Sequence, residues 1–168
     1  MKPTVLTWRH YTIKAAGGRA LAYLTHAKSG TGPFAEAEGA TEQAATDALK
    51  QQLEAREAER PTDSTRDMQT PTRQEFAWAL DVLSFSEPVE SMMRALALAG
   101  DEGITLEELA DVAGYADHGS VNLQLGTAAA EIAKVFGLSY HHETAQNDSV
   151  AATFIIADEG PKQEDGTW

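Results

Sequence analysis

The sequence predicts an α+β protein made of two separately folded parts. Alternating β-branched and aromatic residues precede a long helical pattern in the first sixty residues, and a polar segment with two prolines follows it. Short helical patterns with clear start signals then lead into a final apolar run. The chain has 168 residues, of which 42% are hydrophobic, so each part can bury a core.

The first part begins with three expected strands. Residues 4–14 predict the first because they are rich in β-branched and aromatic side chains. Gly17 and Gly18 can adopt the positive φ angles of a tight hairpin turn, so residues 19–26 predict the returning strand. Residues 34–39 alternate like a third strand.

A helix is expected to complete this part. Thr41 is a suitable N-cap for a run of good helix formers that contains no Gly or Pro. We therefore predict a β-β-β-α domain over residues 1–59, followed by a polar linker over 60–72, which has almost nothing to bury. The apolar stripe expected on the helix consists of Ala45, Leu49 and Leu53.

Local capping signals place the helices of the second part, residues 73–157. Thr72 with Glu75, and Thr105 with Glu108, have the spacing of capping boxes, so each pair predicts a helix start. Another helix is expected from about 88 to 99, where Gly100 can stop it. The side chains expected in the core of these helices are Val89, Met92, Met93, Leu96, Leu98, Leu106, Leu109, Ala110 and Val112.

The last elements expected are a helix and a β-hairpin. Residues 120–136 predict the helix, residues 138–143 and 150–157 predict two strands, and residues 158–168 form an acidic tail. Helix, helix, short turn, helix and hairpin is the order of a winged helix-turn-helix domain. Helical periodicity places one narrow arc of the last helix in the core, namely Val121, Leu125, Ala128, Ile132 and Phe136.

A recurrent G-Y…V-N-L-x-x-G string occupies residues 114–126 of this part, as Gly114, Tyr115, Val121, Asn122, Leu123 and Gly126. With its surroundings, the string resembles the winged-helix module that precedes HNH nuclease domains in some bacterial restriction-type proteins. The resemblance implies a winged-helix fold. Thr127 departs from it, because a basic side chain is expected there.

Residues 11–53 carry a second resemblance. The hairpin, the segment A-E-A-E-G-A-T-E-Q-A and the amphipathic helix are similar to the small β-β-β-α domain of HicB-type antitoxins. The resemblance implies a domain that binds a partner protein and self-associates. A three-stranded sheet also leaves an edge available for an added strand, unless the chain itself covers that edge.

The formal charge of −13 is unevenly distributed. Residues 1–60 sum to +1, whereas residues 73–157 sum to −10 and contain only three basic side chains. A surface that binds nucleic acid is normally basic, because neutralisation of phosphates supplies much of the affinity. The candidate partner-binding face of the second part is therefore acidic, and it comprises Asp101, Glu102, Glu107, Glu108, Asp111 and Asp117.

The outward face of the last helix is a second candidate contact. A helix that reads bases usually presents Arg, Asn or Gln, whereas this one presents mainly small and apolar residues. We expect it to contact a protein partner or a second copy of the chain, and packing within its own domain is an equal alternative. The residues concerned are Asn122, Leu123, Gln124, Thr127 and Lys134.

Two functions fit these patterns. The first is a non-catalytic acidic protein that engages a basic, nucleic-acid-handling protein by mimicking DNA phosphates. It has the general character of the anti-CRISPR and anti-restriction proteins of phages and mobile elements, although such acids can also serve only solubility. The alternative is an antitoxin-like or transcriptional regulator that binds DNA through the winged helix, with further cationic contacts from Arg9, Lys14, Arg19 and Lys28.

The sequence offers no pattern for catalysis. It contains no cysteine, no G-x-S-x-G elbow and no phosphate-binding glycine motif. His141, His142 and Glu143, with His118, are explained better as hydrated surface residues than as metal ligands. We expect no enzyme activity, cofactor or metal. No apolar run could span a bilayer, and the N-terminus lacks a secretory signal, so a cytoplasmic location is expected.

Overall fold

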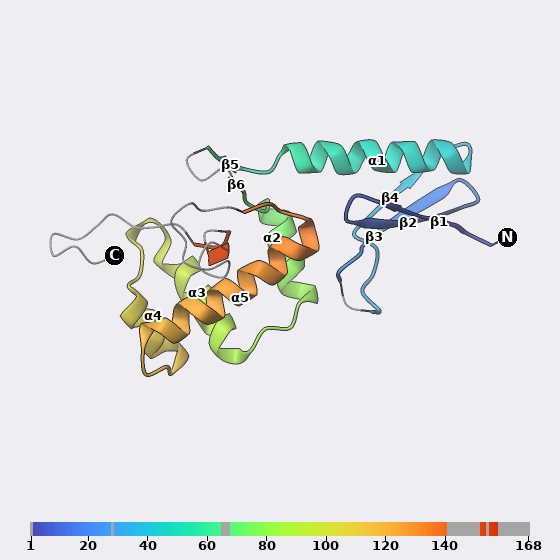
Figure 1. Cartoon of the computed structure of the whole chain (residues 1–168). Helices are drawn as coiled ribbons and strands as arrows, with labels where there is room; N and C mark the ends of the chain where they lie inside the picture. The colour runs from blue at the N-terminus through green and yellow to red at the C-terminus, as the bar shows by residue number, and fades with distance from the viewer. Residues whose placement is uncertain (1, 28, 65–67, 141–151, 154, 158–168) are drawn as a thin grey trace. The chain divides into compact units, whose positions relative to one another are not determined.

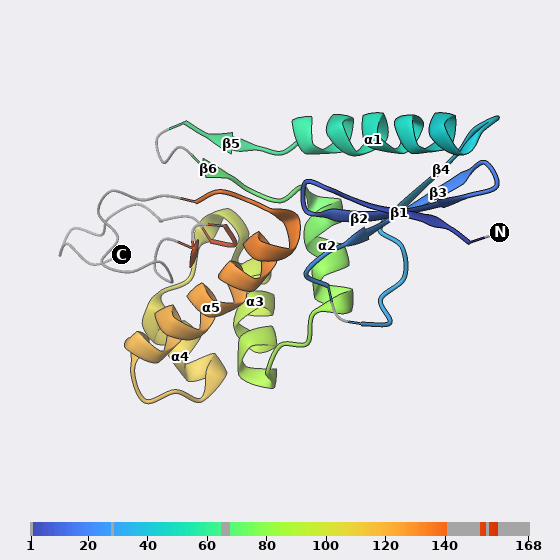
Figure 2. The ribbon, with the colours of Figure 1, turned by 45° about the vertical axis from the view of Figure 1, so that its right-hand side comes forward.

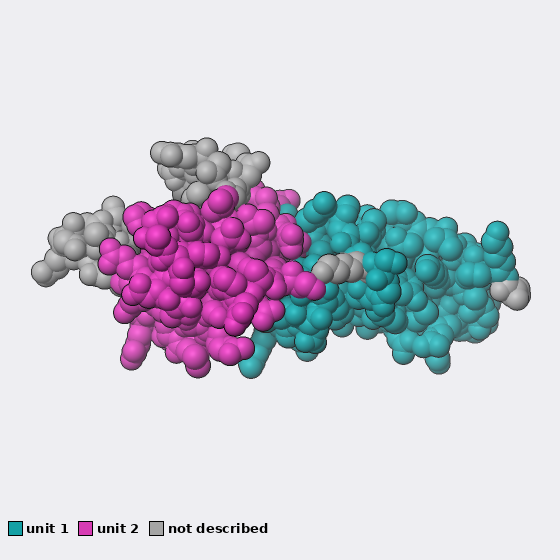
Figure 3. All heavy atoms as spheres, turned by 90° about the horizontal axis from the view of Figure 1, so that it is seen from below, with its two compact units in different colours: residues 1–61, 71–83, 134–138 teal, residues 62–70, 84–133, 139–168 magenta. Residues whose placement is uncertain are grey.

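The computed structural model describes residues 2–27, 29–64, 68–140, 152–153 and 155–157. The described part contains five α-helices and a four-stranded antiparallel sheet, which confirms the α+β class. Figure 3 colours two compact units. Unit 1 consists of residues 1–61, 71–83 and 134–138, and unit 2 consists of residues 62–70, 84–133 and 139–168.

The sheet of unit 1 has one strand more than expected. Its strands are β1 (Thr4–Trp8), β2 (Tyr11–Ala16), β3 (Arg19–Leu24) and β4 (Ala35–Glu38), in that spatial order. The expectation of one strand over residues 4–14 is wrong, because a two-residue turn at Arg9 and His10 folds β2 back onto β1. Arg9 has a φ of 52°, which is uncommon for a residue other than glycine and gave no signal in the sequence.

The second hairpin forms where it was expected. Gly17 and Gly18 have φ angles of 58° and 80° and join β2 to β3. A hairpin turn with two positive φ angles matches the twist of the flanking strands. Gly18 also lies against Gly39, whose N–H donates to the Gly18 carbonyl at 2.8 Å.

Helix α1 (Glu42–Ala58) covers one face of the sheet (Figure 1). Its predicted N-cap is confirmed, because the Thr41 hydroxyl accepts a hydrogen bond from the N–H of Ala44 at 3.1 Å. The predicted apolar stripe is also confirmed, since its three residues are fully buried. They cover the inward side chains of β2 and β3, namely Tyr11, Ile13, Ala15, Ala20, Ala22 and Leu24.

Helix α2 (Arg73–Val82) belongs to unit 1, although residue 73 was expected to open a different domain. Its Trp78 ring meets the edge of the Phe34 ring at 5.3 Å between centroids, and Phe136 lies 5.8 and 5.9 Å from those two rings. Aromatic rings bury large apolar areas at such distances. The aromatic contacts therefore join segments that are far apart in the sequence.

Two short strands lie within the segment that was expected to be a linker. The short strands β5 (Thr62–Asp63) and β6 (Met68–Gln69) pair with each other, and Met68 is buried. Arg60 is buried as well, because its charge is compensated by Glu75. The proline and threonine content of this segment did not predict that Met68 and Arg60 would be buried.

Unit 2 contains α3 (Glu87–Ala99), the 3₁₀ turn η1 (Gly100–Glu102) and α4 (Leu106–Ala113). Helix α4 starts with the predicted capping box and ends at Gly114, which has a left-handed conformation. Val89, Met92 and Met93 are buried as expected. The expectations for Leu98 and Val112 are wrong. Leu98 is 82% exposed, because it points away from the arc that the buried residues of α3 share, and Val112 on α4 is 49% exposed.

Helix α5 (His118–Phe136) follows (Figure 2). All five residues of its predicted core arc are buried. Helix α5 is buried over more of its circumference than that arc, because Gly126, Ala129, Ala133 and Val135 are buried too.

The final β-hairpin is not observed in the described residues. Residues 138–140 are not in a strand. The backbone N–H groups of Ile155 and Ile156 donate to the carbonyls of Ala152 and Thr153, which makes a helical turn where a strand was expected. The local hydrogen bonds satisfy this backbone without a neighbouring strand. Residues 141–151 and the tail, 158–168, lie outside the described residues.

Candidate functional site

The clearest chemical feature of unit 2 is a set of exposed carboxylates, which we call the acidic surface. Residues 84–133 contain nine acidic side chains and a single basic one, Arg94. Each of the nine is exposed, and no ion pair within the described part of the chain involves any of them. The set comprises Glu87, Glu90, Asp101, Glu102, Glu107, Glu108, Asp111, Asp117 and Glu131.

Two of the predicted acidic residues also cap helices. The Glu108 carboxylate accepts hydrogen bonds from the N–H and the hydroxyl of Thr105, both at 2.9 Å, and these donors hold its pKa below the ordinary value. Asp117 accepts from the N–H of Ser120 at 3.0 Å, at the start of α5. The other four predicted acids, Asp101, Glu102, Glu107 and Asp111, have no such structural task among the described contacts.

Unit 1 distributes its charges differently. Its residues carry ten basic and nine acidic side chains, whereas unit 2 carries three basic and seventeen acidic ones. Arg9, Arg19 and Arg60 each form an ion pair with a glutamate of unit 1. The two units therefore have formal charges of +1 and −14.

Of the five residues predicted to make partner or dimer contacts on the last helix, three are exposed. Leu123 is 56% exposed, and Thr127 and Lys134 are also exposed, whereas Asn122 and Gln124 are half-buried. The Thr127 hydroxyl donates to the Leu123 carbonyl at 2.7 Å, so its hydrogen bond remains within the helix.

The cationic residues proposed for nucleic acid contact already have partners. Arg9 pairs with Glu54 and Glu57, and its guanidinium lies 4.5 Å from the centre of the Trp8 ring. Arg19 pairs with Glu36. Lys14 lies 4.7 Å over the ring of Tyr23, and Lys28 is outside the described residues. Much of the charge that could neutralise phosphate is therefore balanced within unit 1.

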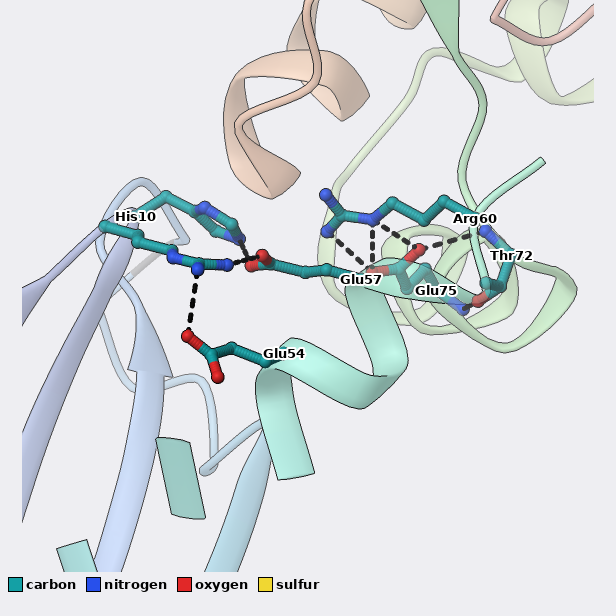
Figure 4. Close-up of polar contacts among 7 residues, drawn as sticks. His10, Glu54, Glu57, Arg60, Thr72 and Glu75 are labelled. Atoms are coloured by element: carbon teal, nitrogen blue, oxygen red, sulfur yellow. Dashed lines mark hydrogen bonds and ion pairs between the residues drawn. The ribbon is translucent and has the colours of Figure 1, made fainter. Parts of the chain in front are cut away.

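A buried polar cluster links α1 to α2 in unit 1 (Figure 4). Arg60 donates from Nε and Nη2 to Oε1 of Glu75, at 3.0 and 2.7 Å. The other carboxylate oxygen of Glu75 accepts from the N–H of Thr72 at 2.9 Å, and the Thr72 hydroxyl accepts from the N–H of Glu75 at 3.2 Å. Glu75 thus completes both a capping box and an ion pair. The capping signal was visible in the sequence, but the pairing with Arg60 was not.

His10, Tyr11 and Glu57 form an adjoining cluster that sequence reasoning missed. Nε2 of His10 lies 3.5 Å from Oε1 of Glu57, and neither atom, nor the Tyr11 hydroxyl, makes a hydrogen bond within the described chain. Burial, with smaller effects from Arg60 and Arg9, lowers the pKa of His10 to about 4, although Glu57 and Glu75 oppose that shift. Burial and Glu57 raise the pKa of Tyr11. The imidazole is therefore neutral at pH 7.

A histidine with a pKa of about 4 is a weak base at neutral pH, and no serine or cysteine lies among the residues of the cluster. No group of three or more His, Asp or Glu side chains in the described chain is arranged to hold a metal ion. His141, His142 and Glu143, which were expected to be hydrated surface residues and not ligands, lie outside that part of the chain.

Comparison with known proteins gives no relatives. No protein-family model, curated protein or solved structure matches the chain. Among its described helices, none is both long enough and apolar enough to cross a membrane.

Proposed function

We propose that the protein is a non-catalytic binding protein whose acidic surface engages a basic, nucleic-acid-handling protein. The observation that carries this proposal is the contrast between the units. Arginine side chains pair with four of the nine acids of unit 1, whereas the nine carboxylates of the acidic surface are all exposed and unpaired in the described structure. Such a field attracts a cationic groove and competes with the phosphates that the groove normally binds.

The fold supports an interface rather than a flexible acidic tail. Helix α4 presents Glu107, Glu108 and Asp111 on one side while Leu109 and Ala110 anchor its other side in the core. Carboxylates fixed on a packed helix lose less side-chain freedom on binding than carboxylates of an unfolded segment. An inhibitor of anti-CRISPR or anti-restriction type is the form of this function that we favour.

DNA binding through the winged helix is the weaker alternative. Helix α5, which would be the recognition helix of such a domain, presents Leu123 and Thr127 outward, and the two arginines proposed to assist are paired with glutamates. A phosphate-binding surface would need those ion pairs to exchange for phosphate contacts.

A charge-neutralised variant tests the proposal. Purified Cas9 with its guide RNA and a purified restriction endonuclease serve as probes, and DNA cleavage is measured with and without the protein. A matched control variant loses the same number of negative charges from exposed positions of unit 1. The test variant carries Asp101→Asn, Glu102→Gln, Glu107→Gln and Asp111→Asn, and the control carries Glu38→Gln, Asp47→Asn, Glu59→Gln and Asp81→Asn.

We expect the natural chain and the control to inhibit at least one probe and the test variant to lose at least tenfold in potency. Added duplex DNA should relieve the inhibition by competition. The proposal is overturned if neither nuclease is inhibited, or if the natural chain itself binds duplex DNA tightly at low salt and releases it as salt is added.

A further inference from the structure

The sheet of unit 1 has an edge strand, β1, that contains no charged residue. β1 lies at one end of the sheet order, and β2 is the one strand beside it in the described structure (Figure 2). Helix α1 packs against β2, β3 and β4. One side of β1 therefore presents backbone N–H and C=O groups that no strand of the described chain pairs.

The two edges of this sheet differ in their protection against further pairing. Edge strands are commonly guarded by charged side chains, prolines or bulges. β4, at the other edge, carries the exposed Glu36 and Glu38. β1 has the sequence TVLTW and a regular register along β2, with no charge or proline within the strand, although Pro3 precedes it and Arg9 follows it. Its Val5 is 58% exposed, so an apolar, β-branched side chain is available for contact at this edge.

The β1 edge carries no charge of its own that would oppose a second copy of the chain as the occupant. The whole chain has a formal charge of −13, so association through most acidic surfaces would be repulsive. Pairing two β4 edges would bring four glutamates together. Pairing two β1 edges brings no charged residue of either strand together, and the sequence TVLTW is rich in residues that favour strands.

The strand is also self-complementary in an antiparallel register. A two-fold axis at Leu6 sets Leu6 opposite its equivalent and Val5 opposite the Thr7 of the second copy. Thr4 then lies opposite Trp8, so all five residues of each strand are paired. Such a contact is isologous, as expected for a symmetric dimer, and every opposed pair contains an apolar or β-branched side chain.

We propose that the protein forms a homodimer in which β1 pairs with β1 of a second copy, antiparallel about Leu6, to make a continuous eight-stranded sheet. The contact lies in unit 1 and is independent of the acidic surface. It also differs from the contact expected on the outward face of α5.

Single-cysteine variants test the register directly, because the natural chain contains no cysteine. Leu6→Cys in the full chain should form a covalent dimer under mild oxidation, since directly opposed residues of antiparallel strands bring their Cβ atoms about 5 Å apart. Thr12→Cys, on the interior strand β2, is the matched control and should stay monomeric on a denaturing gel.

Sedimentation velocity over micromolar to submillimolar concentrations measures dimerisation through β1 without a covalent cross-link. The natural chain should be dimeric, and Val5→Lys should weaken the dimer at least tenfold, because it places two lysines at the paired edge. Leu98→Lys and Leu123→Lys add the same charge at other exposed apolar positions and should leave the dimer intact. A natural chain that is monomeric throughout, a Leu6→Cys variant that does not cross-link, or a dimer that only Leu123→Lys disrupts would each overturn the proposal.

Discussion

Arg60 and Glu75 form an ion pair from which solvent is almost excluded, with 3% and 0% of their side chains exposed. Nε and Nη2 of the guanidinium donate to the carboxylate, whose Oε2 also accepts from the backbone N–H of Thr72. Each charge is therefore compensated only while the other is present. This contact joins the end of α1 to the start of α2.

Removing one charge of this pair should be strongly destabilising. Arg60→Met leaves a buried carboxylate without its cation, and the free energy of unfolding should fall by about 3–5 kcal/mol in urea denaturation. Adding Glu75→Gln to that variant should recover part of the loss, because no buried charge remains. The control Arg19→Met removes an exposed pair and should leave the urea midpoint nearly unchanged. Equal effects of Arg60→Met and Arg19→Met would contradict the buried role.

Acid should destabilise the fold through His10. Its pKa is about 4 in the folded chain, against 6.5 for an unperturbed histidine. Between these values the unfolded chain binds a proton that the folded chain does not, so stability is lost as pH falls below 6.5. The loss from this group is at most about 3 kcal/mol and should be complete near pH 4.

The contribution of His10 can be isolated by difference. Urea unfolding of the natural chain and of His10→Gln, each at pH 7.5 and pH 5, should show a smaller acid-induced loss for the variant. An NMR titration in which the His10 imidazole of the folded chain has its midpoint near 6.5 would disprove the depressed pKa.

The sequence predicted best what depends on neighbours along the chain. The Thr72 and Thr105 capping boxes and the buried arc of α5 involve residues a few positions apart, so spacing alone reveals them. The turn at Arg9 was missed because a positive φ there is imposed by the hairpin and not by a glycine. The partnership of Arg60 with Glu75 was missed because it forms only after α2 has packed into unit 1.

The six acidic candidates all lie at exposed positions, but the sequence did not show which of them lack a structural role. That Glu108 caps α4 followed from the sequence, whereas the absence of arginine partners around the acidic surface required the fold. The neutralisation of Arg9 by Glu54 and Glu57 likewise depends on the contact of a hairpin with a helix 45 to 48 positions away.

The hydrogen bonds that cap α4 should affect the pKa of Glu108. Thr105→Ala removes the hydroxyl that both donates to the Glu108 carboxylate and accepts from its N–H. The pKa of Glu108 should rise toward its ordinary value, and the free energy of unfolding should fall by about 1 kcal/mol. Carbonyl NMR titration gives the pKa, and Thr105→Ser, which keeps the hydroxyl, should behave like the natural chain. An unchanged Glu108 pKa in Thr105→Ala would show that the hydroxyl does not stabilise the carboxylate.

Gly39 should not tolerate a methyl group. A Cβ atom there would lie 2.4 Å from the backbone nitrogen of Ala45, in the first turn of α1. We expect Gly39→Ala to lower the free energy of unfolding by about 1–3 kcal/mol. Gly32→Ala is the control, because a Cβ at that position meets no atom within 4 Å. If both variants unfold at the same urea concentration, the backbone at position 39 does not lie as close to the first turn of α1 as described.

The shared use of Glu75 constrains how this chain can change in evolution. A relative that replaces Arg60 by an uncharged residue must also replace Glu75, and any replacement other than glutamine then leaves the N–H of Thr72 without its side-chain acceptor. Positions 60 and 75 should therefore vary together, and position 72 should vary with them toward residues that begin a helix without a capping box. Substitutions at these three positions would become acceptable only in combination, so the junction between α1 and α2 should diverge more slowly than the exposed acids of unit 2.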